Sequence, residues 1–500
     1  MGVPENVRKI TRPKNTIVYT IRDGVYGVRE RAGTNYAPGG KVRPINGKVV
    51  GHIIDNKFIP IVEPVLNIPM FLSYGSSALI KKFSNDIYED LLKIYPINET
   101  KEIMSIASLK VIKPSIKCSR YSNEYERTYI SIYYPDCHLS KNSINSLLSR
   151  IGMNSEKREK FYQSRLSRTP ESHQIAIDGT LKQDNSTVNS LSGYSYKSRL
   201  KNTKDISIIY AYDINTKEPL CSTVFPGNNL DVVSYRQFVK ENSIKNGIIV
   251  TDKGFPISEI EDIISSNKGL HFLTPLRRND KRIINNNMFQ YEETINGIEK
   301  EILGKKIKIN ENRYLYSFFD VATMSKETHD FIKSANKNND FDAKKFEKKR
   351  NAFGTITLES DLDMSLKDAY LCYAERWKLE LVFKAYKNDI GLCETNVQSD
   401  YSVIGMEFIN FISTIITTRI IELFRGKDLF RKNTYGEIMD DLTSAWRKRE
   451  KDLNKPSCSD GKWVNTLPSA LDLMKLLELL KEEMPKEKRG RGRPKKSISS

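Results

Sequence analysis

Five side chains of one stretch have the types and the spacing that suit phosphate chemistry. The set consists of one acid, three bases and an aromatic residue. They are Tyr373, Arg376, Glu380, Lys384 and Lys387. Because a helix turns about 100° per residue, offsets of three, four, four and three place all five on one stripe. A lone carboxylate among cations can hold a metal ion beside phosphate groups. The alternative interpretation is structural: Glu380 and Lys384 form an ordinary surface ion pair, and Tyr373 faces a core.

One long helix over Ser365 to Gly391 would present this stripe. Ser365 is the expected N-cap, with Asp368 three residues later, and Gly391 is a plausible stop.

Two aspartates stand at or just past the ends of short apolar strands. The segment QIAIDGT ends in Asp178, and NGIIVTDKGF runs directly into Asp252. An aspartate that merely opens a turn is common next to glycine, so each motif alone is weak. Together with Glu380, the two aspartates give three acids placed by three different elements.

Three converging carboxylates predict a site for two divalent cations that act on a phosphodiester. Oxygen ligands favour Mg²⁺, with Mn²⁺ as a substitute, and the six cysteines and five histidines form no zinc-like pair. Arg376, Lys384 and Lys387 would then bind the phosphates that flank the scissile one.

The composition indicates a soluble globular protein with a polyanionic partner. Of its 500 residues 28% are charged and 39% hydrophobic, and the net charge is +18. Residues 1–50 hold ten Lys and Arg against three Asp and Glu, and residues 486–500 hold seven against one. Basic ends of this kind favour nucleic acid, although a solvated basic surface explains them too. Unpaired cysteines and the lack of an apolar leader indicate a cytoplasmic protein without a membrane partner, and a DNA partner would make it nucleoid-associated.

The sequence pattern changes several times along the chain, which indicates several structural regions. Short strands with basic faces are expected over 1–65 and helices over 76–165. Two helices around Gly152 form either a helix-turn-helix that presents Lys157, Arg158 and Lys160 to DNA or a plain helical hairpin. Residues 266–360 are expected to be an inserted β-containing module with a mobile basic loop, KSANKNNDFDAKKFEKKR. The apolar run 408–424 predicts a buried helix rather than a membrane span.

The tail from residue 485 is low in complexity and predicted to be disordered. Its Arg491-Gly-Arg493-Pro resembles the core of an AT-hook, which lies in the narrow minor groove of A·T-rich DNA.

The motifs taken together resemble a known family. The spacing of Tyr373, Arg376, Glu380 and Lys387 matches the Tyr-Arg-Glu-Lys signature of DDE transposases of the insertion-sequence-four group. Asp178-Gly-Thr and Asp252-Lys-Gly-Phe look like the first and second aspartate motifs of that family. The resemblance covers roughly residues 75–425.

This resemblance implies an α/β fold, an RNase H-like catalytic core with a β-rich insertion before the glutamate helix and accessory regions at both ends. The resulting divisions are an N-terminal DNA-binding region, the first part of the core, the insertion, the second part of the core, a C-terminal helical region and the tail: 1–165, 170–265, 266–360, 361–425, 426–484 and 485–500.

The resemblance also implies cut-and-paste transposition, in which a homodimer cleaves the inverted-repeat ends of a transposon and joins them to target DNA. Tyr373, Arg376 and Lys387 would contact the end DNA, and an aromatic of the insertion, with Phe353 as one candidate, would stack on a flipped base. Two alternatives remain at this point: a retired transposase that only binds DNA, and a nuclease or resolvase on the same core.

Overall fold

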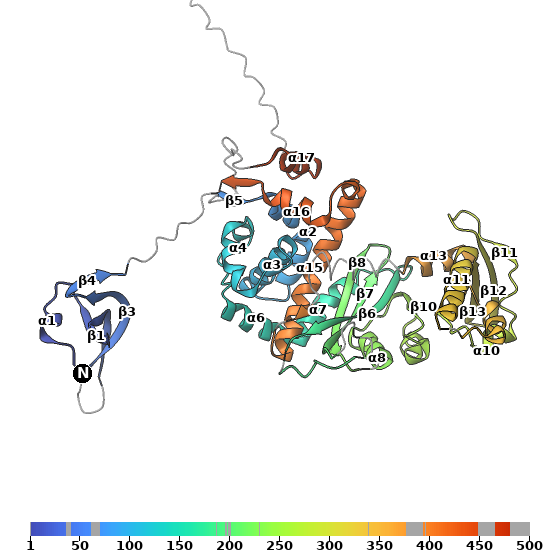
Figure 1. Cartoon of the computed structure of the whole chain (residues 1–500), viewed down its shortest axis with the longest axis horizontal. Helices are drawn as coiled ribbons and strands as arrows, with labels where there is room; N and C mark the ends of the chain where they lie inside the picture. Colours follow the sequence, from blue (N-terminus) through green and yellow to red (C-terminus); the bar gives the residue numbers. More distant parts are fainter. Residues whose placement is uncertain are drawn as a thin grey trace, which may run out of the picture. The chain divides into compact units, whose positions relative to one another are not determined.

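The computed structural model divides the chain into two compact units, Met1–Pro69 and Met70–Ser500 (Figure 1). The residues that it describes are 2–36, 42–61, 71–186, 188–195, 198, 202–229, 231–338, 340–376, 394–395, 397–448 and 466–480.

The N-terminal unit is a four-stranded antiparallel sheet in the order β1-β2-β3-β4, with one short helix. Its elements are α1 Glu5–Arg8, β1 Thr16–Arg22, β2 Val25–Tyr36, β3 Val42–Ile54 and β4 Lys57–Pro60. Val7, Val28 and Ile53 form its small buried core. On the other face the Tyr19 ring covers Gly27, where a Cβ atom would lie 2.3 Å from the ring.

A large mixed sheet forms the centre of the second unit, so the predicted α/β class is confirmed. Its strand order is β11-β12-β13-β14-β10-β9-β6-β7-β8, and β15 pairs with the far end of β6. Strands β6, β7 and β8 are antiparallel neighbours, whereas β9 and β10 run parallel to β6. The strands are β6 Gln174–Asp184, β7 Asp205–Asp213, β8 Glu218–Pro226, β9 Gly247–Val250, β10 Leu270–Pro275, β11 Glu293–Thr294, β12 Ile302–Asn310, β13 Arg313–Asp320, β14 Thr355–Ser360 and β15 Glu394–Thr395.

Helices that precede and follow the sheet in sequence pack together beside it (Figure 1). The preceding elements are β5 Phe71–Ser73, α2 Gly75–Leu92, α3 Ile97–Ile112, η1 Cys118–Arg120, α4 Tyr121–Arg127, α5 Ile130–Tyr133, α6 Lys141–Met153 and α7 Ser155–Leu166. The following elements are α15 Asp400–Gly426, η4 Leu429–Arg431, α16 Tyr435–Thr443, β16 Trp446–Lys448 and α17 Pro468–Leu476. Strand β16 pairs with β5, which joins the two helical groups.

Helix α15 is the central helix of this layer, as the apolar run 408–424 predicted. Within the described part of the chain it is the helix long and apolar enough to cross a membrane, but 83% of that apolar window is buried inside the protein. It approaches α6 very closely, because a Cβ atom on Gly405 would lie 2.0 Å from the Leu148 carbonyl oxygen. Only glycine fits at that contact.

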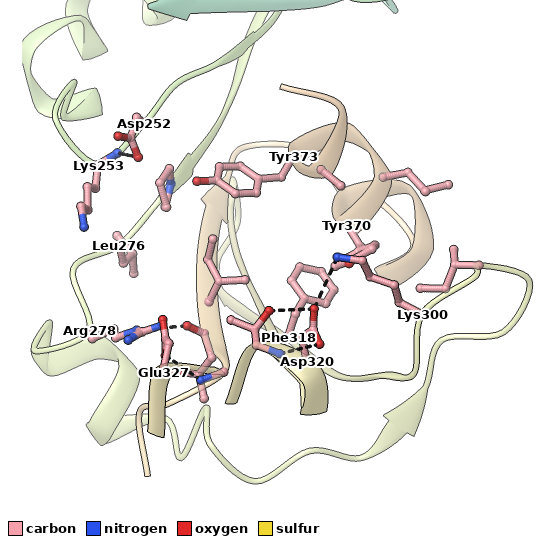
Figure 2. Close-up of a pocket in the computed structure, with 18 of the residues that line it drawn as sticks. Asp252, Lys253, Leu276, Arg278, Lys300, Phe318, Asp320, Glu327, Tyr370 and Tyr373 are labelled. Carbon is pink, nitrogen blue, oxygen red and sulfur yellow. Dashed lines mark hydrogen bonds and ion pairs between the residues drawn. The ribbon is translucent and has the colours of Figure 1, made fainter. Parts of the chain in front are cut away.

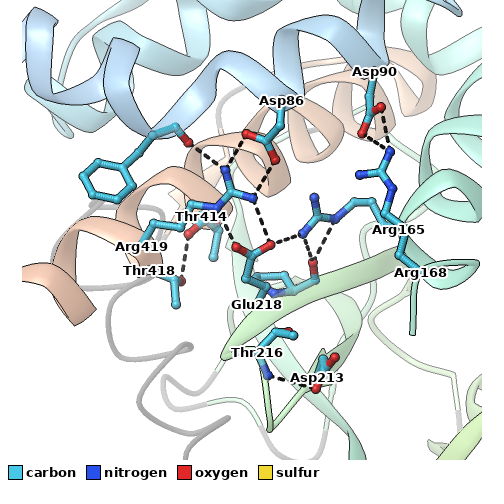
Figure 3. A network of polar contacts seen from close by, with 12 residues as sticks. Asp86, Asp90, Arg165, Arg168, Asp213, Thr216, Glu218, Thr414, Thr418 and Arg419 are labelled. Carbon is cyan, nitrogen blue, oxygen red and sulfur yellow. Dashed lines mark hydrogen bonds and ion pairs between the residues drawn. The ribbon is translucent and has the colours of Figure 1, made fainter. Parts of the chain in front are cut away.

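A polar network ties α2, α7, β8 and α15 together (Figure 3). Arg419 of α15 donates to Asp86 at 2.7 and 2.8 Å and, through Nε, to Glu218 at 2.6 Å. Glu218 also accepts from Arg165, whose side chain is 5% exposed. Bidentate arginine–carboxylate pairs of this kind fix orientation as well as distance.

The remaining helices connect the strands of the sheet. They are α8 Asp231–Glu241, η2 Ile257–Glu259, α9 Glu261–Ser265, α10 Lys281–Asn285, α11 Val321–Asn338, α12 Ala343–Arg350 and α13 Leu366–Glu375.

The predicted mobile basic loop of the insertion is wrong in the described residues, because most of it is helical. Asp342 caps α12 by accepting a hydrogen bond from the Lys345 backbone at 3.1 Å. The rings of Phe331 and Phe346 pack together with a centroid distance of 5.5 Å, which holds α12 against α11. Phenylalanines spaced along a lysine-rich stretch were the signal that it buries one face.

Candidate active site

The parallel pairing of β6 with β9 brings the two predicted aspartates to one face of the sheet. Ala176 pairs with Val250, and Asp178 and Asp252 each follow two residues later. Because successive side chains of a strand alternate between faces, equal offsets from one pair place both carboxylates on the same face at neighbouring positions. The structure therefore brings Asp178 and Asp252 together.

The two carboxylates are oriented in the same way. Oδ1 of Asp178 accepts from the Gly179 backbone N–H at 2.8 Å, and Oδ1 of Asp252 accepts from the Lys253 N–H at 2.8 Å. Local bonds of this kind are typical of a turn-opening aspartate. Here they also fix the direction of two neighbouring acids.

Helix α13 and the residue that follows its last turn bring Tyr373 and Arg376 of the predicted stripe to this face. It begins as predicted, since Oγ of Ser365 accepts from the Asp368 N–H at 3.0 Å. Nη1 of Arg376 lies 3.7 Å from Oδ2 of Asp178, and these side chains are only 14% and 23% exposed. At this burial the charges interact more strongly than they would in open solvent.

Tyr373 completes the group. Burial raises the pKa of its phenol; the Arg376 cation opposes this rise, while the negative charges of Asp252 and Asp178 add to it. The guanidinium of Arg376 lies 5.6 Å from the centre of the Tyr373 ring. Asp178, Asp252, Tyr373 and Arg376 thus share one electrostatic environment, although they come from three separate segments of the chain.

The other predicted site residues lie outside the described residues. They are Glu380, Lys384, Lys387, Arg491 and Arg493. Within the described ranges no group of three His, Cys, Asp or Glu side chains is arranged to hold a metal ion. The two aspartates still fit a hard divalent cation, because both supply carboxylate oxygens at adjacent positions.

A groove of about 1530 Å³ opens beside Asp252, between the end of β9, the insertion and α13. We call it the groove; its walls include Lys253, Arg277, Lys300, Phe318 and Tyr370. Figure 2 shows Tyr373 directed from α13 across it toward Asp252.

Ion pairs partly neutralise the walls of the groove. Arg278 lies 2.8 Å from Glu327, and Lys300 lies 3.6 Å from Asp320. Sequence reasoning missed Arg277 and Arg278, although two arginines directly after an apolar strand, in FLTPLRRND, were a usable signal.

The two helices around Gly152 form a hairpin that packs into the protein. Each basic side chain proposed to contact DNA has an intramolecular partner. Lys160 pairs with Glu156 at 2.6 Å, Lys157 lies over the Tyr95 ring, and Arg158 donates to the Gly152 carbonyl at 2.8 Å. These contacts favour the plain helical hairpin over the DNA-presenting alternative.

Phe353 is buried, with 7% of its surface exposed, and it packs against Phe331 and Phe346. Its ring is therefore not available to stack on a base in this structure.

This fold and site define a mixed-sheet domain in which carboxylates from two neighbouring parallel strands and an arginine meet beside a large groove. That arrangement is suited to phosphodiester chemistry. Comparison with protein families agrees, because residues 169–400 match the transposase DDE domain. This part of the chain is therefore similar to a transposase DDE domain. Enzymes of this family cleave DNA and transfer strands, so the predicted class of enzyme is confirmed.

A cryo-EM structure of a piggyBac transposase synaptic complex with hairpin DNA aligns with a TM-score of 0.41 and 12% identity, over 82% of this chain and 86% of that chain. So slight a likeness supports no argument about function. No curated protein matches the chain.

Proposed function

We propose that this protein performs cut-and-paste transposition with Asp178, Asp252 and Glu380 as its catalytic acids. One observation carries the assignment: Asp178 and Asp252 occupy equivalent positions after a register pair of two parallel strands, in a domain of the transposase DDE family. Glu380 is proposed from its place in the sequence, four residues after Arg376.

An RNase H-like core is the narrower fold that we propose. The strand order β8-β7-β6-β9-β10 supports it, with three antiparallel strands followed by two that run parallel to the first of them. The predicted insertion began at residue 266, but β10, at Leu270–Pro275, extends the core sheet. We therefore propose that the insertion begins after β10 and ends with β14.

Each residue of the site has a proposed role. Asp178, Asp252 and Glu380 would hold two divalent cations, which DDE transposases use and which are typically Mg²⁺. When bound, such cations supply Lewis acidity at the attacking and leaving oxygens of a phosphodiester. Arg376, whose Nη1 lies 3.7 Å from Asp178, would also bind a neighbouring phosphate of the DNA. Tyr373 narrows the approach to Asp252 and offers a ring and a hydroxyl to the DNA.

The partner that follows from this domain is double-stranded DNA, both the inverted-repeat ends and the target. We further propose membership of the insertion-sequence-four group, supported by the spacing of Tyr373, Arg376, Glu380 and Lys387. A homodimer that pairs two ends is the assembly that we expect.

The test is cleavage and joining of a supercoiled plasmid that carries the ends of the element, in Mg²⁺ and in Mn²⁺. We expect Asp178→Asn, Asp252→Asn and Glu380→Gln each to lower the rate by about 1000-fold or more, since each removes a proposed ligand charge. Asp262→Asn is the matched control, because Asp262 forms an exposed ion pair with Arg236.

Full activity of any of the three variants would remove that residue from the catalytic set. DNA binding by the unaltered protein without cleavage in either metal would instead support a retired transposase. Hydrolysis without joining would support a nuclease.

A further inference from the structure

Helix α12 carries an exposed row of lysines that the catalytic site does not use. Lys344, Lys345 and Lys348 are all exposed, and we call them the α12 stripe. At 100° per residue they lie on the side of the helix away from Phe346. None of the three has an ion-pair partner among the described residues; the acid of α12, Glu347, pairs with Arg350 at 3.3 Å.

The stripe sits on a firm support rather than on a loose loop. Phe346 packs against Phe331 and Phe353 at centroid distances of 5.5 and 6.2 Å. Phe353 is buried, so this aromatic cluster joins α12 to α11 and to the start of β14.

The same support leads to the groove. Glu327 of α11 accepts from the Gly354 backbone at 2.9 Å and from Arg278 at 2.8 Å. Gly354 has φ +70°, and a Cβ atom there would lie 2.5 Å from Cβ of Met324, so glycine permits this close approach. Arg278 directly follows Arg277 at the end of β10, so the base of α12 is linked to the wall of the groove beside Asp252.

We propose that the α12 stripe, with Arg277 and Lys253, binds the phosphate backbone of duplex DNA that extends from the catalytic site through the groove. Lys253 and Arg277 are exposed at the groove and have no ion-pair partner in the described ranges. Several such cations along one path attract a polyanion by counterion release, without reading its sequence. This inference rests on the proposed function for the direction of the path but not for the binding itself.

The first test measures binding of the full chain to a fluorescein-labelled duplex of arbitrary sequence over a series of NaCl concentrations. For the variant K344A/K345A/K348A we expect the slope of log affinity against log salt to shrink by about two to three and affinity near 0.1 M salt to fall by up to about 100-fold. The matched control is K240A/K245A/K268A, which removes three exposed lysines near the starts of β9 and β10, opposite Asp252. An unchanged slope, or an equal change in the control, would overturn the proposal.

The second test identifies which DNA lies on the path, using the plasmid with the element's ends. A loss of end cleavage in the α12 variant assigns the stripe to DNA beside the transposon end. A loss of joining alone assigns it to target DNA, and normal rates of both steps contradict the proposal. Asp252→Asn is tested separately in the plasmid assay. If this variant still cleaves DNA, the catalytic assignment is wrong, but the salt dependence of duplex binding still decides the binding proposal.

Discussion

At the scale of single residues, strand β6 carries both the proposed catalytic residue Asp178 and a buried ion pair. Lys182, four residues after Asp178 and on the same face, contacts Glu407 at 2.6 Å, and their side chains are 1% and 2% exposed. Glu407 also accepts from Asn410 at 2.9 Å. Removing one partner of such a pair costs several kcal/mol, because the other charge stays buried. The pair therefore fixes β6, the strand that carries the proposed catalytic residue Asp178, on α15.

Lys110 of α3 is a second buried cation of this region, beside Lys182, and gives a prediction with a defined pH window. Burial, with a further contribution from the Lys182 charge, lowers its pKa to about 8, although Glu407 and Cys118 oppose the shift. At pH values between about 8 and 10.5, Lys110 carries a proton more often in the unfolded chain than in the folded chain. Stability must then rise with pH across that window, and Lys110→Met removes this dependence.

Chemical denaturation at a series of pH values measures the effect. We expect Lys110→Met to be more stable than the unaltered protein by about 3 kcal/mol near pH 7, with the difference disappearing toward pH 10.5. Lys113→Met is the control, since Lys113 lies on the same helix end in an ion pair with Glu124 and its side chain is 56% exposed. A gap that stays constant with pH would contradict the assignment.

At the scale of elements, the Arg419 network joins the helical layer to the sheet. Burial favours the neutral form of Glu218, but the hydrogen bond and charge of Arg419, with the charge of Arg165, outweigh it and hold the pKa of Glu218 below its usual range. The stability that this carboxylate contributes is therefore present above its unfolded pKa and is lost as the pH falls through its lower folded pKa.

Arg419→Ala should lower the free energy of unfolding by about 3 kcal/mol, because it leaves Glu218 and Asp86 without their bidentate partner. Arg425 lies on the same helix and pairs with Glu422, and its side chain is 47% exposed. Arg425→Ala should therefore lower the free energy of unfolding by less than about 1 kcal/mol. Urea unfolding at neutral pH compares the two. The difference between Arg419→Ala and the unaltered protein should shrink in acid, and equal costs for both variants would mean that the network is not structural.

Local patterns in the sequence predict part of this fold, whereas contacts between distant segments are not predictable from them. The end of β9 before Asp252, the cap at Ser365 and the buried helix around 408–424 were predictable, because each depends on neighbouring residues. The predicted strand end at Asp178 was wrong, because β6 continues to Asp184 in register with β7. The pairing of β6 with β9, which makes two weak aspartate motifs into a site, depends on register between distant segments. Likewise, Lys182 and Glu407 are 225 residues apart, and no local pattern connects them. Helix α12 was not predicted, because Phe346 is the one apolar side chain that it packs against the protein and the rest of its sequence is rich in lysine.

At the scale of the whole molecule, most of the excess positive charge lies in residues 1–50 and 486–500 of the sequence, outside the residues 169–400 that match the DDE domain. Residues 486–500 carry seven Lys and Arg against one acid, a composition that suits general attraction to DNA. The Arg491-Gly-Arg493-Pro segment adds a specific expectation, since narrow A·T-rich minor grooves attract arginine more strongly than they attract other cations of equal charge.

Replacing Arg491 and Arg493 by alanine should therefore remove a preference for A·T-rich over G·C-rich duplexes, while Lys495→Ala with Lys496→Ala, an equal loss of charge, should keep it. The measurement is the ratio of dissociation constants for the two duplexes at one salt concentration. We expect the arginine variant to bring this ratio down by about tenfold and both variants to weaken total binding alike. Because the tail lies far in sequence from Asp178 and Asp252, cleavage of a pre-bound end should proceed at the same rate in both. If the two double variants change the ratio equally, the tail acts through charge alone and the AT-hook interpretation is wrong.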